Sequence, residues 1–524
     1  MQAMMQPVIK DVVLLGAGHA HVQVLRRFGM KPLPGVRFTL ITREVHTPYS
    51  GMLPGLVAGR YRFDEAHIDT GPLARFAGAR LYQSSATGID MQARHVICDN
   101  RPPVPYDILS INTGSTPNTA TVPGADEHAI PVKPIDGFLR HFAGLMERVT
   151  ENGGHRRIAL VGGGAGGVEL LLSLEARLRR EAKAAGRDPR WLTFTLVSGA
   201  ADILPEFPAA FQRRFRALFA QRGISIVTGA QVTRVEAGAL QIEGRAPLAA
   251  DEILWTTEAR PPEWLSTTGL PLDERGFLKV DGALQVEGQE GVFAAGDIVA
   301  FTPRSLPKSG VYAVRAGPVL AENIRRSLTG YPLKRYKPQR EAMYLVSTGE
   351  DYALGTRNGI VFQGAWVWRW KDRIDRRFME RFNVLPTMSV ERPVAASQLA
   401  GPDAKEISAA AMRCGGCGAK VGATVLSRAL SEIEPVLRPD VVVGMHAPDD
   451  AAVVDTGGPR LSIHSVDYFR AIVDDRYQTP LVERGAGVGQ PEPENCADRE
   501  IGALRDPKVG VLVVELDDLA SGER

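Results

Sequence analysis

Cysteine is scarce in this chain of 524 residues, which has four: Cys98, Cys414, Cys417 and Cys496. Four cysteines do not make a disulfide framework, which predicts a reducing compartment. The beginning of the sequence lacks a basic segment followed by a separate apolar stretch and a cleavage site, so no signal peptide is expected. No uninterrupted apolar run approaches the roughly 20 residues needed to span a bilayer. The expected location is the cytoplasm.

An excess of charge of one sign is also missing. Lys and Arg total 62 and Asp and Glu total 60, so nothing in the overall charge predicts a nucleic-acid partner. The hydrophobic fraction of 44% and the charged fraction of 23% are those of an ordinary globular protein. The length predicts roughly three to four domains.

Glycine is plentiful, at 54 residues, and it marks the first candidate site. Residues 8–15 read as a buried strand and lead directly into Gly16-Ala17-Gly18-His19 and a helical segment. A strand, a Gly-x-Gly turn and a helix together predict a dinucleotide site. Gly16 permits the tight turn, Gly18 lets a pyrophosphate approach the backbone, and the helix N-terminus offers N–H groups to the anion.

Two features of this first turn depart from the usual fingerprint. His21 stands in place of the third glycine, and the second strand ends in Thr42, Arg43 and Glu44 without an acid at the usual ribose-binding position. Glu44 or Thr42 is then the candidate ribose ligand. We interpret His19 and His21 as packing or polar contacts of the turn and not as metal ligands. The alternative is a glycine-rich turn that binds no ligand.

A second turn carries the full G-x-G-x-x-G pattern. Residues 157–161 predict a buried strand, and Gly162, Gly164 and Gly167 follow it at the start of an amphipathic helix. The next strand ends at Ser198, where a terminal acid would repel the 2′-phosphate of NADPH. Because Ser198 is not acidic, NADPH is not excluded as the donor. No arginine follows directly to bind the 2′-phosphate, however, and this absence favours NADH. Two such turns predict two dinucleotides, and hence a flavin reduced by a nicotinamide.

A third motif is a strand that ends in Gly296-Asp297. In flavoproteins with two dinucleotides such a strand returns to the FAD domain, and the aspartate accepts a hydrogen bond from a ribitol hydroxyl. The helix predicted over residues 309–327 would direct its N-terminus at the flavin and stabilise the reduced ring. Lys308 would add positive charge there; the alternative is a solvated lysine that flanks the helix.

With these motifs, roughly residues 8–385 resemble the pyridine nucleotide-disulfide oxidoreductase superfamily, and within it the type II NADH dehydrogenase-like branch. Disulfide reductases of that superfamily carry a Cys-x4-Cys pair after the first fold, whereas residues 46–61 contain no cysteine. The resemblance therefore implies FAD and NAD(P)H as cofactors and direct electron transfer to a small acceptor, either a quinone or dye or a selenium or sulfur species. It places Tyr49, Ser50 and Gly51 beside the isoalloxazine ring and Glu169 beside the nicotinamide.

A tryptophan-rich segment follows in the predicted third domain. Trp366, Trp368 and Trp370 alternate along the chain and precede a basic helix. Residues 366–381 could seat on a membrane interface, which would make the protein peripheral to the inner face of the membrane. The alternative is a strand with one tryptophan face packed in the core or in a homodimer contact, followed by a solvated basic helix.

The last part of the chain carries a different set of motifs. After a linker rich in Ala, Pro and small polar residues come a Cys-x-x-Cys sequence and several paired carboxylates. No second Cys/His pair follows at metal spacing, so zinc is not expected. The set resembles the N-terminal part of selenide, water dikinase (selenophosphate synthetase), which implies ATP and Mg²⁺. By that resemblance Cys417 handles selenide, Lys420 lies beside the phosphates, and Asp450 and Asp467 lie at Mg²⁺.

The dikinase resemblance fades after about residue 479, and the remaining chain is too short for a complete kinase. The leading hypothesis is therefore an FAD-dependent NAD(P)H oxidoreductase with a partial dikinase module. The first alternative is a selenide, water dikinase in which the flavoprotein is a helper domain. The second is a degenerate remnant without enzymatic activity.

The predicted fold class is α/β, with two nested Rossmann-like domains for FAD and NAD(P), a C-terminal α+β interface domain and a partial α/β kinase-like module. The predicted segments are 1–150 (FAD-binding, first part), 151–280 (NAD(P)-binding), 281–330 (FAD-binding, return segment), 331–388 (interface domain), 389–410 (linker) and 411–524 (dikinase-like module). The expected cofactor-binding residues are Gly16, Ala17, Gly18, His19, Thr42, Arg43, Ser50, Gly51, Thr113, Gly114, Gly162, Gly164, Gly167, Glu169, Ser198, Gly296 and Asp297. The expected catalytic residues are Glu169, Lys308, Cys417 and Lys420, and the expected metal ligands are Asp450 and Asp467.

Overall fold

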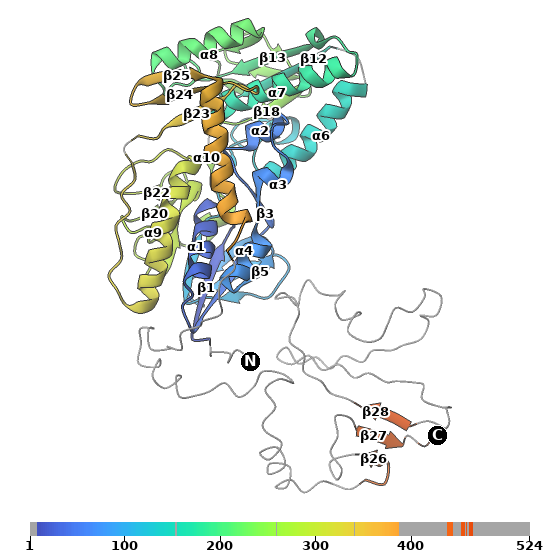
Figure 1. Ribbon diagram of the computed structural model, residues 1–524, viewed down its shortest axis with the longest axis vertical. Helices are drawn as coiled ribbons and strands as arrows, with labels where there is room; N and C mark the ends of the chain where they lie inside the picture. Colours follow the sequence, from blue (N-terminus) through green and yellow to red (C-terminus); the bar gives the residue numbers. More distant parts are fainter. Residues whose placement is uncertain are drawn as a thin grey trace. The chain divides into compact units, whose positions relative to one another are not determined.

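A computed structural model describes residues 8–151, 155–257, 259–339, 341–386, 438–443, 452–455, 457 and 461–464. Contacts divide the chain into two compact units, one of which is Val8–Gly401 and the other of which holds the C-terminal residues from Pro402 onward. The first unit contains the elements that carry all the dinucleotide motifs (Figure 1).

The first glycine turn belongs to a five-stranded parallel sheet. Its strands are β21 (Val292–Ala294), β9 (Ile108–Ile111), β1 (Lys10–Leu15), β2 (Val36–Thr42) and β5 (Ala79–Gln83), in that order across the sheet. The central strand β1 is almost completely buried over its last four residues, as expected for a parallel sheet covered on both faces. Helices α1 (His19–Met30) and α9 (Gly310–Thr329) pack against each other.

The second glycine turn belongs to a second five-stranded parallel sheet. Its order is β11 (Ile130–Pro131), β18 (Glu252–Trp255), β12 (Arg156–Val161), β13 (Leu192–Val197) and β14 (Ile224–Val227). Helices α6 (Ile135–Glu151), α7 (Ala165–Ala184) and α8 (Ala209–Gln221) accompany it. Because this sheet is inserted between β9 and β21 of the first one, the nested α/β arrangement is confirmed.

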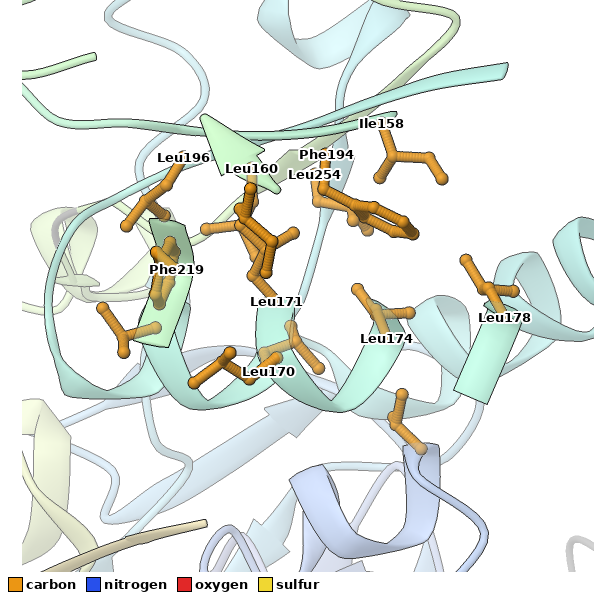
Figure 2. Close-up of a cluster of buried hydrophobic side chains, with 14 of the residues drawn as sticks. Ile158, Leu160, Leu170, Leu171, Leu174, Leu178, Phe194, Leu196, Phe219 and Leu254 are labelled. Carbon is orange, nitrogen blue, oxygen red and sulfur yellow. The ribbon is translucent and has the colours of Figure 1, made fainter. Parts of the chain in front are cut away.

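Leucine spacing on α7 fixes that helix against the second sheet. Leu170, Leu171, Leu174 and Leu178 are buried in one cluster with strand residues of β12, β13 and β18, and Leu171, Leu174 and Leu178 point toward those strands (Figure 2). The spacing of three to four residues places these side chains on one broad face of the helix, which is the face that the sheet covers. This packing determines where the N-terminus of α7 lies, directly after the glycine turn. The strand residues in the cluster include Ile158, Leu160, Phe194, Leu196 and Leu254.

Two crossover segments join the two sheets. β10 (Thr116–Pro117) follows the first sheet and pairs antiparallel with β19 (Ala259–Arg260), which follows the second. The outgoing and returning chains therefore lie side by side.

The third structural region is a small antiparallel sheet with one long helix. β23 (Tyr344–Ser347), β24 (Ala353–Arg357) and β25 (Ile360–Gly364) form the sheet, and α10 (Ala365–Asn383) follows at once. The expectation of a strand of alternating tryptophans was wrong, because all three tryptophans lie on α10. Alternation over only five residues does not distinguish a strand from one and a half turns of helix.

Helix α10 extends from the region of α7 to the region of α1 and β3 (Figure 1). At its C-terminal end the Arg381 carbonyl accepts a hydrogen bond from Arg26 on α1, and Asn383 donates to the His67 carbonyl. α10 therefore contacts the first fold as well as its own sheet.

Shorter elements complete the first unit. They are β3 (His46–Pro48), α2 (Leu53–Val57), α3 (Phe63–Ala66), β4 (His67–Asp69), α4 (Thr70–Ala77), β6 (Ala86–Asp90), β7 (His95–Cys98), β8 (Val104–Pro105), α5 (Ala125–His128), β15 (Val232–Glu236), β16 (Ala239–Ile242), β17 (Leu248–Ala249), β20 (Leu278–Val280) and β22 (Val299–Phe301). In the described part of the chain, no helix is both long and apolar enough to cross a membrane.

The other unit contains one described sheet, in which β26 (Val441–Val443), β27 (Ala452–Asp455) and β28 (Leu461–His464) pair antiparallel. The four residues predicted from the dikinase resemblance lie outside the described residues. They are Cys417, Lys420, Asp450 and Asp467.

Candidate active site

The first glycine turn lies at the carboxyl edge of the first sheet. Because its strands are parallel, the segments that follow β1, β2, β9 and β21 all emerge at this edge. Gly16 adopts a φ of +88°, and its N–H donates to the Ile41 carbonyl at 2.7 Å. The candidate residues gathered here are Gly16, Ala17, Gly18, His19, Thr42, Arg43, Thr113, Gly114, Gly296 and Asp297.

Gly18 is required for a different reason from the one expected. A Cβ at this position would overlap the carboxamide and the backbone carbonyl of Asn112. The predicted reason was close approach of a pyrophosphate, but the side of Gly18 that lacks a Cβ faces the protein. Asn112 follows β9 and is almost fully buried.

The two histidines of the turn have distinct surroundings. His21 is buried, with Nδ1 2.5 Å from the Gly16 carbonyl and Nε2 2.8 Å from the Ser110 hydroxyl, so its interpretation as a polar contact of the turn is confirmed. The His19 ring lies edge-on to Tyr49, with ring centroids 5.5 Å apart, and its buried Nε2 has no hydrogen-bond partner among the described residues. Burial lowers the pKa of both imidazoles to about 4, so both are neutral at pH 7.

Three other candidates of this edge make ion pairs or hydrogen bonds. Arg43 pairs with Asp136 at 3.1 Å and with Glu44 at 3.3 Å, so Glu44, a candidate ribose ligand, has a cationic neighbour. The Thr42 hydroxyl donates to the Glu44 carbonyl at 2.9 Å. Asp297, the predicted ribitol ligand, is mostly buried and lies 3.0 Å from the Lys133 ammonium.

Lys308 is not a freely solvated lysine. Its ammonium lies 3.6 Å from the centroid of the Phe277 ring and donates to the Val299 carbonyl. Burial lowers the pKa of Lys308 to about 8, although Asp297 opposes this shift. The residue borders a pocket that Asp297 and Ser309 also line.

The second glycine turn has the same position at the edge of the second sheet. Gly162 has a φ of +129°, and a Cβ on Gly167 would overlap the Gly162 carbonyl, so strand and helix approach too closely for a side chain. A Cβ on Gly164 would meet no atom within 4 Å, which leaves this backbone open to a ligand. Ser198 lies directly beside the turn, where a Cβ on Gly163 would come within 2.5 Å of its hydroxyl.

The residues of both edges fit bound dinucleotides. Gly18 and Gly164 are the N-caps of α1 and α7, and neither glycine has a side chain that could cap its helix. At α1 the Asn112 carboxamide accepts hydrogen bonds from the Ala20 and His21 N–H groups. Helix N-termini that follow glycine turns at the edge of a parallel sheet are suited to bind a pyrophosphate. The unpartnered Nε2 of His19 is a further polar group available to a ligand at the first edge.

A buried cluster of charged and polar groups joins the two folds. We define the α10 cluster as Lys371, Asp375, Glu169, Tyr49 and Gly51. The Lys371 ammonium donates to the Gly51 carbonyl at 2.6 Å and to Asp375 at 2.7 Å, and it lies 3.9 Å from the Glu169 carboxylate. Glu169 lies in the first turns of α7, and Gly51 follows β3 of the first fold.

Further contacts hold this cluster in place. Glu169 accepts a hydrogen bond from the Ser347 backbone N–H at 2.7 Å. Tyr49 stacks on Phe378 of α10 with ring centroids 4.5 Å apart. The Ser50 hydroxyl lies against Gly310 in the first turn of α9. The structure therefore brings together Glu169 and the segment 49–51, which the sequence predicted at separate rings.

The charges of the cluster affect one another. Burial raises the pKa of Glu169 to about 7, and Lys371 opposes that shift without cancelling it. Burial alone would lower the pKa of Lys371, but Asp375 and Glu169 outweigh it and raise the pKa, which keeps the ammonium charged. The cluster therefore contains a permanent cation beside a carboxyl group that titrates near neutrality.

Four residues at these edges were not predicted from the sequence: Asn112, Lys133, Lys371 and Asp375. Lys371 and Asp375 read as an ordinary i,i+4 ion pair on a solvated basic helix, because periodicity does not reveal which face of an isolated helix is covered. A signal for Asn112 existed in its position directly before the Thr113-Gly114 turn. In the described segments no group of three or more His, Cys, Asp or Glu side chains is arranged to hold a metal ion.

Removal of the Lys371 ammonium is expected to destabilise the protein strongly. Lys371→Met leaves the Asp375 and Glu169 carboxyl groups buried without their cation, which costs about 3–5 kcal/mol in the free energy of unfolding. Chemical denaturation of wild type and variant measures the difference.

Arg369→Met is the matched control for this variant, since Arg369 is exposed on the same helix and should change stability by less than about 0.5 kcal/mol. The double variant Lys371→Met/Asp375→Leu should recover part of the loss, because it no longer leaves Asp375 unpaired. Equal stability of wild type and Lys371→Met would contradict the buried cluster.

Comparison with known proteins agrees with this geometry. The family model described as pyridine nucleotide-disulphide oxidoreductase matches residues 10–317. An NADH dehydrogenase-like protein of Bacillus subtilis is 26% identical over 294 residues, which cover 55% of this chain and 76% of that protein. A demethylphylloquinone reductase of Synechocystis is 26% identical over 371 residues, which cover 68% of this chain and 87% of that protein.

Two solved structures share the fold. The sulfide:quinone oxidoreductase of Aquifex aeolicus superposes with a TM-score of 0.60 at 20% identity and covers 72% of this chain and 92% of its own. The NDH2 of Plasmodium falciparum in complex with NADH gives a TM-score of 0.61 at 15% identity, over 72% of this chain and 100% of its own. With the family match over more than half of its length, this chain belongs to the pyridine nucleotide-disulphide oxidoreductase family and is an NAD(P)H-dependent flavoprotein oxidoreductase.

Proposed function

We propose that the protein oxidises NADH through FAD and passes the electrons to a small quinone-type acceptor. One observation carries the proposal. The Lys371 ammonium contacts both the Gly51 carbonyl and the Glu169 carboxylate, so the segment expected at the isoalloxazine ring and the residue expected at the nicotinamide meet at one cation. Two dinucleotides extended from their glycine turns toward this point would bring their reactive rings together.

The first fold is suited to hold FAD along its carboxyl edge. The N-terminus of α1 would bind the pyrophosphate. The Asp297 carboxylate would accept a hydrogen bond from a ribitol hydroxyl, which would replace part of its ion pair with Lys133. The N-terminus of α9, next to Ser50, would stabilise negative charge on the ring system. Bound FAD supplies the hydride and electron transfer, and the protein supplies orientation and electrostatics.

The second fold is suited to hold the nicotinamide dinucleotide. The open backbone at Gly164 and the N-terminus of α7 would bind its pyrophosphate. Ser198 carries no negative charge that would repel the 2′-phosphate of NADPH. It also carries no positive charge that would bind this phosphate, and for that reason we propose NADH as the donor.

A quinone acceptor agrees with the properties of Glu169. Reduction of a quinone to a quinol takes up two protons with two electrons, and a carboxyl group with a pKa of about 7 can donate protons near neutral pH. The relative named as a demethylphylloquinone reductase supports this choice over a selenium or sulfur species, which remains the second candidate acceptor.

The proposed cofactors and donor are tested by anaerobic titration of the purified full-length protein. We expect a flavin absorbance spectrum that bleaches on addition of NADH, and bleaches more slowly with NADPH. Stopped-flow absorbance measures both rates. A protein that purifies without flavin and takes up none from solution would contradict the proposal.

The role of Glu169 predicts a pH dependence for quinone reduction. Since the pKa is raised to about 7, Glu169 is protonated below that pH and loses its proton above it, so the rate should fall as pH rises through about 7. Glu169→Gln removes the proton donor and should lower the rate by about 100-fold. Steady-state assays with a water-soluble quinone measure both effects.

Ferricyanide serves as the control acceptor because it takes up electrons without protons. The decline in rate near pH 7 should therefore be absent with ferricyanide in the wild-type protein. If the rate of quinone reduction by Glu169→Gln fell near pH 7 by the same factor as in wild type, Glu169 could not be the group whose titration causes the fall.

We further propose that the exposed face of α10 binds an anionic membrane surface. Trp366, Trp370 and Ile374 recur every four residues and are 51%, 39% and 39% exposed, so they form one apolar stripe along the helix. Arg369, Arg373 and Arg377 form a parallel exposed stripe. Tryptophan beside arginine is suited to the boundary between lipid headgroups and acyl chains, and a quinone is itself lipid-soluble.

Vesicle binding tests this surface. The double variant Trp366→Ser/Trp370→Ser should bind vesicles of phosphatidylglycerol at least about tenfold more weakly than wild type, because it loses the apolar stripe. Co-sedimentation measures the bound fraction, and phosphatidylcholine vesicles should bind weakly in both cases. If the variant instead turns a dimer into a monomer in light scattering, the face is a homodimer contact.

The dikinase-like module over residues 411–524 and the segment boundaries at 150, 280, 330, 388 and 410 stay predictions. ATP and Mg²⁺ would bind through residues outside the described part of the chain, and the family match ends at residue 317. The proposed oxidoreductase function does not depend on that module.

A further inference from the structure

Asn112 is a buried polar residue that the proposed function does not use directly. It follows β9 directly, and its side chain is almost fully enclosed. Its Oδ1 accepts hydrogen bonds from the backbone N–H groups of Ala20 at 3.0 Å and His21 at 3.3 Å. Its Nδ2 donates to the Ala295 carbonyl at 2.6 Å, and its own carbonyl accepts from Gly18 at 3.2 Å.

These partners belong to two distant parts of the sequence. Gly18, Ala20 and His21 form the glycine turn and the first turn of α1. Ala295 directly precedes Gly296-Asp297 at the end of the return strand. One carboxamide therefore connects the segment expected to bind the pyrophosphate with the segment expected to bind the ribitol chain.

The chemistry of the amide suits this connection. An asparagine presents a carbonyl that accepts and an amino group that donates, and here the acceptor faces helix N–H groups while the donor faces a strand carbonyl. A residue with only one of these properties would leave a buried partner unsatisfied. A Cβ on Gly18 would overlap Asn112, so the glycine turn packs directly against this residue.

The second fold achieves its close packing in another way. Thr256 occupies the equivalent place after β18, and its hydroxyl donates to the Val161 carbonyl at 3.0 Å. That bond joins two neighbouring strands of one sheet. The bonds of Asn112 reach a helix N-terminus on one side and the return strand on the other.

We propose that Asn112 is a positioning residue for the flavin nucleotide, which fixes the pyrophosphate-binding turn and the ribitol-binding segment relative to each other. The inference rests on the proposed function, since it assumes that FAD binds at the first turn. Asn112 acts through backbone groups. Its replacement should therefore weaken FAD binding and leave nicotinamide binding at the second turn intact.

Asn112→Asp keeps the hydrogen-bond acceptor of the side chain and removes its donor. The carboxylate still accepts from Ala20 and His21, but it faces the Ala295 carbonyl with no hydrogen to donate. When protonated, the acid can donate to that carbonyl, and burial raises the pKa of such a group. We expect the dissociation constant for FAD to rise at least about tenfold at pH 8, and to return to within about threefold of wild type at pH 5.5.

The experiment reconstitutes flavin-free full-length protein with FAD and follows the quenching of flavin fluorescence at both pH values. The other titratable groups near Asn112 are His19 and His21 on α1 and the Asp297–Lys133 pair beyond Ala295. All are present in wild type, so its own pH dependence corrects for them. Asn100→Asp, an exposed position in the same fold, is the control for the added charge and should match wild type.

The outcomes distinguish the inference from the function on which it rests. If wild type binds FAD and Asn112→Asp binds it equally well at pH 8, the inference is overturned and the function stands. If wild type binds no FAD, the proposed function fails first. Asn112→Ser, whose short hydroxyl cannot reach both partners, should bind FAD weakly at both pH values while NADH binding persists. Loss of secondary structure in both variants at every pH would make Asn112 a purely structural residue and overturn the inference.

Discussion

A single buried ammonium connects the functional parts of this molecule. Lys371 is 7% exposed and contacts Gly51 of the first fold, Glu169 of the second and Asp375 of its own helix. A buried cation is tolerated only where opposite charges and hydrogen bonds compensate for its lost hydration. The contacts of Lys371 therefore fix α10 relative to both folds. They also place α10 beside the point where the two reactive rings would meet.

The rest of the site follows from the parallel sheets. In each sheet the strands leave the core at one edge, and a helix N-terminus lies next to the central strand there. The two edges reach close packing by different means. The second uses Gly167 against the Gly162 carbonyl, whereas the first accepts His21 and fills the space with hydrogen bonds to Ser110 and Gly16. A missing third glycine in the sequence therefore did not mean a missing site.

Burial keeps some titratable groups of the site neutral, and neighbouring opposite charges keep others ionised. The imidazoles of His19 and His21 are neutral because burial lowers their pKa values, and Lys371 is charged because two carboxyl groups surround it. Glu169 lies between these extremes, with a pKa of about 7. A carboxyl group that titrates near neutrality, beside a permanent cation, is suited to reactions that couple electrons to protons.

The sequence by itself determined both parallel sheets, both glycine turns and the return strand at Gly296-Asp297, because strand and helix periods and turn chemistry are local properties of the chain. It misassigned the tryptophan segment, because five alternating residues are compatible with a strand or a helix. It did not reveal the roles of Lys133, Lys371 and Asp375, and for Asn112 it offered only the position directly before the Thr113-Gly114 turn. Each of these side chains meets a partner more than 90 residues away, apart from the Lys371–Asp375 pair itself. Only the tertiary structure decides which face of α10 is buried and which carbonyl an amide reaches, because those contacts depend on how the elements pack and not on any local pattern.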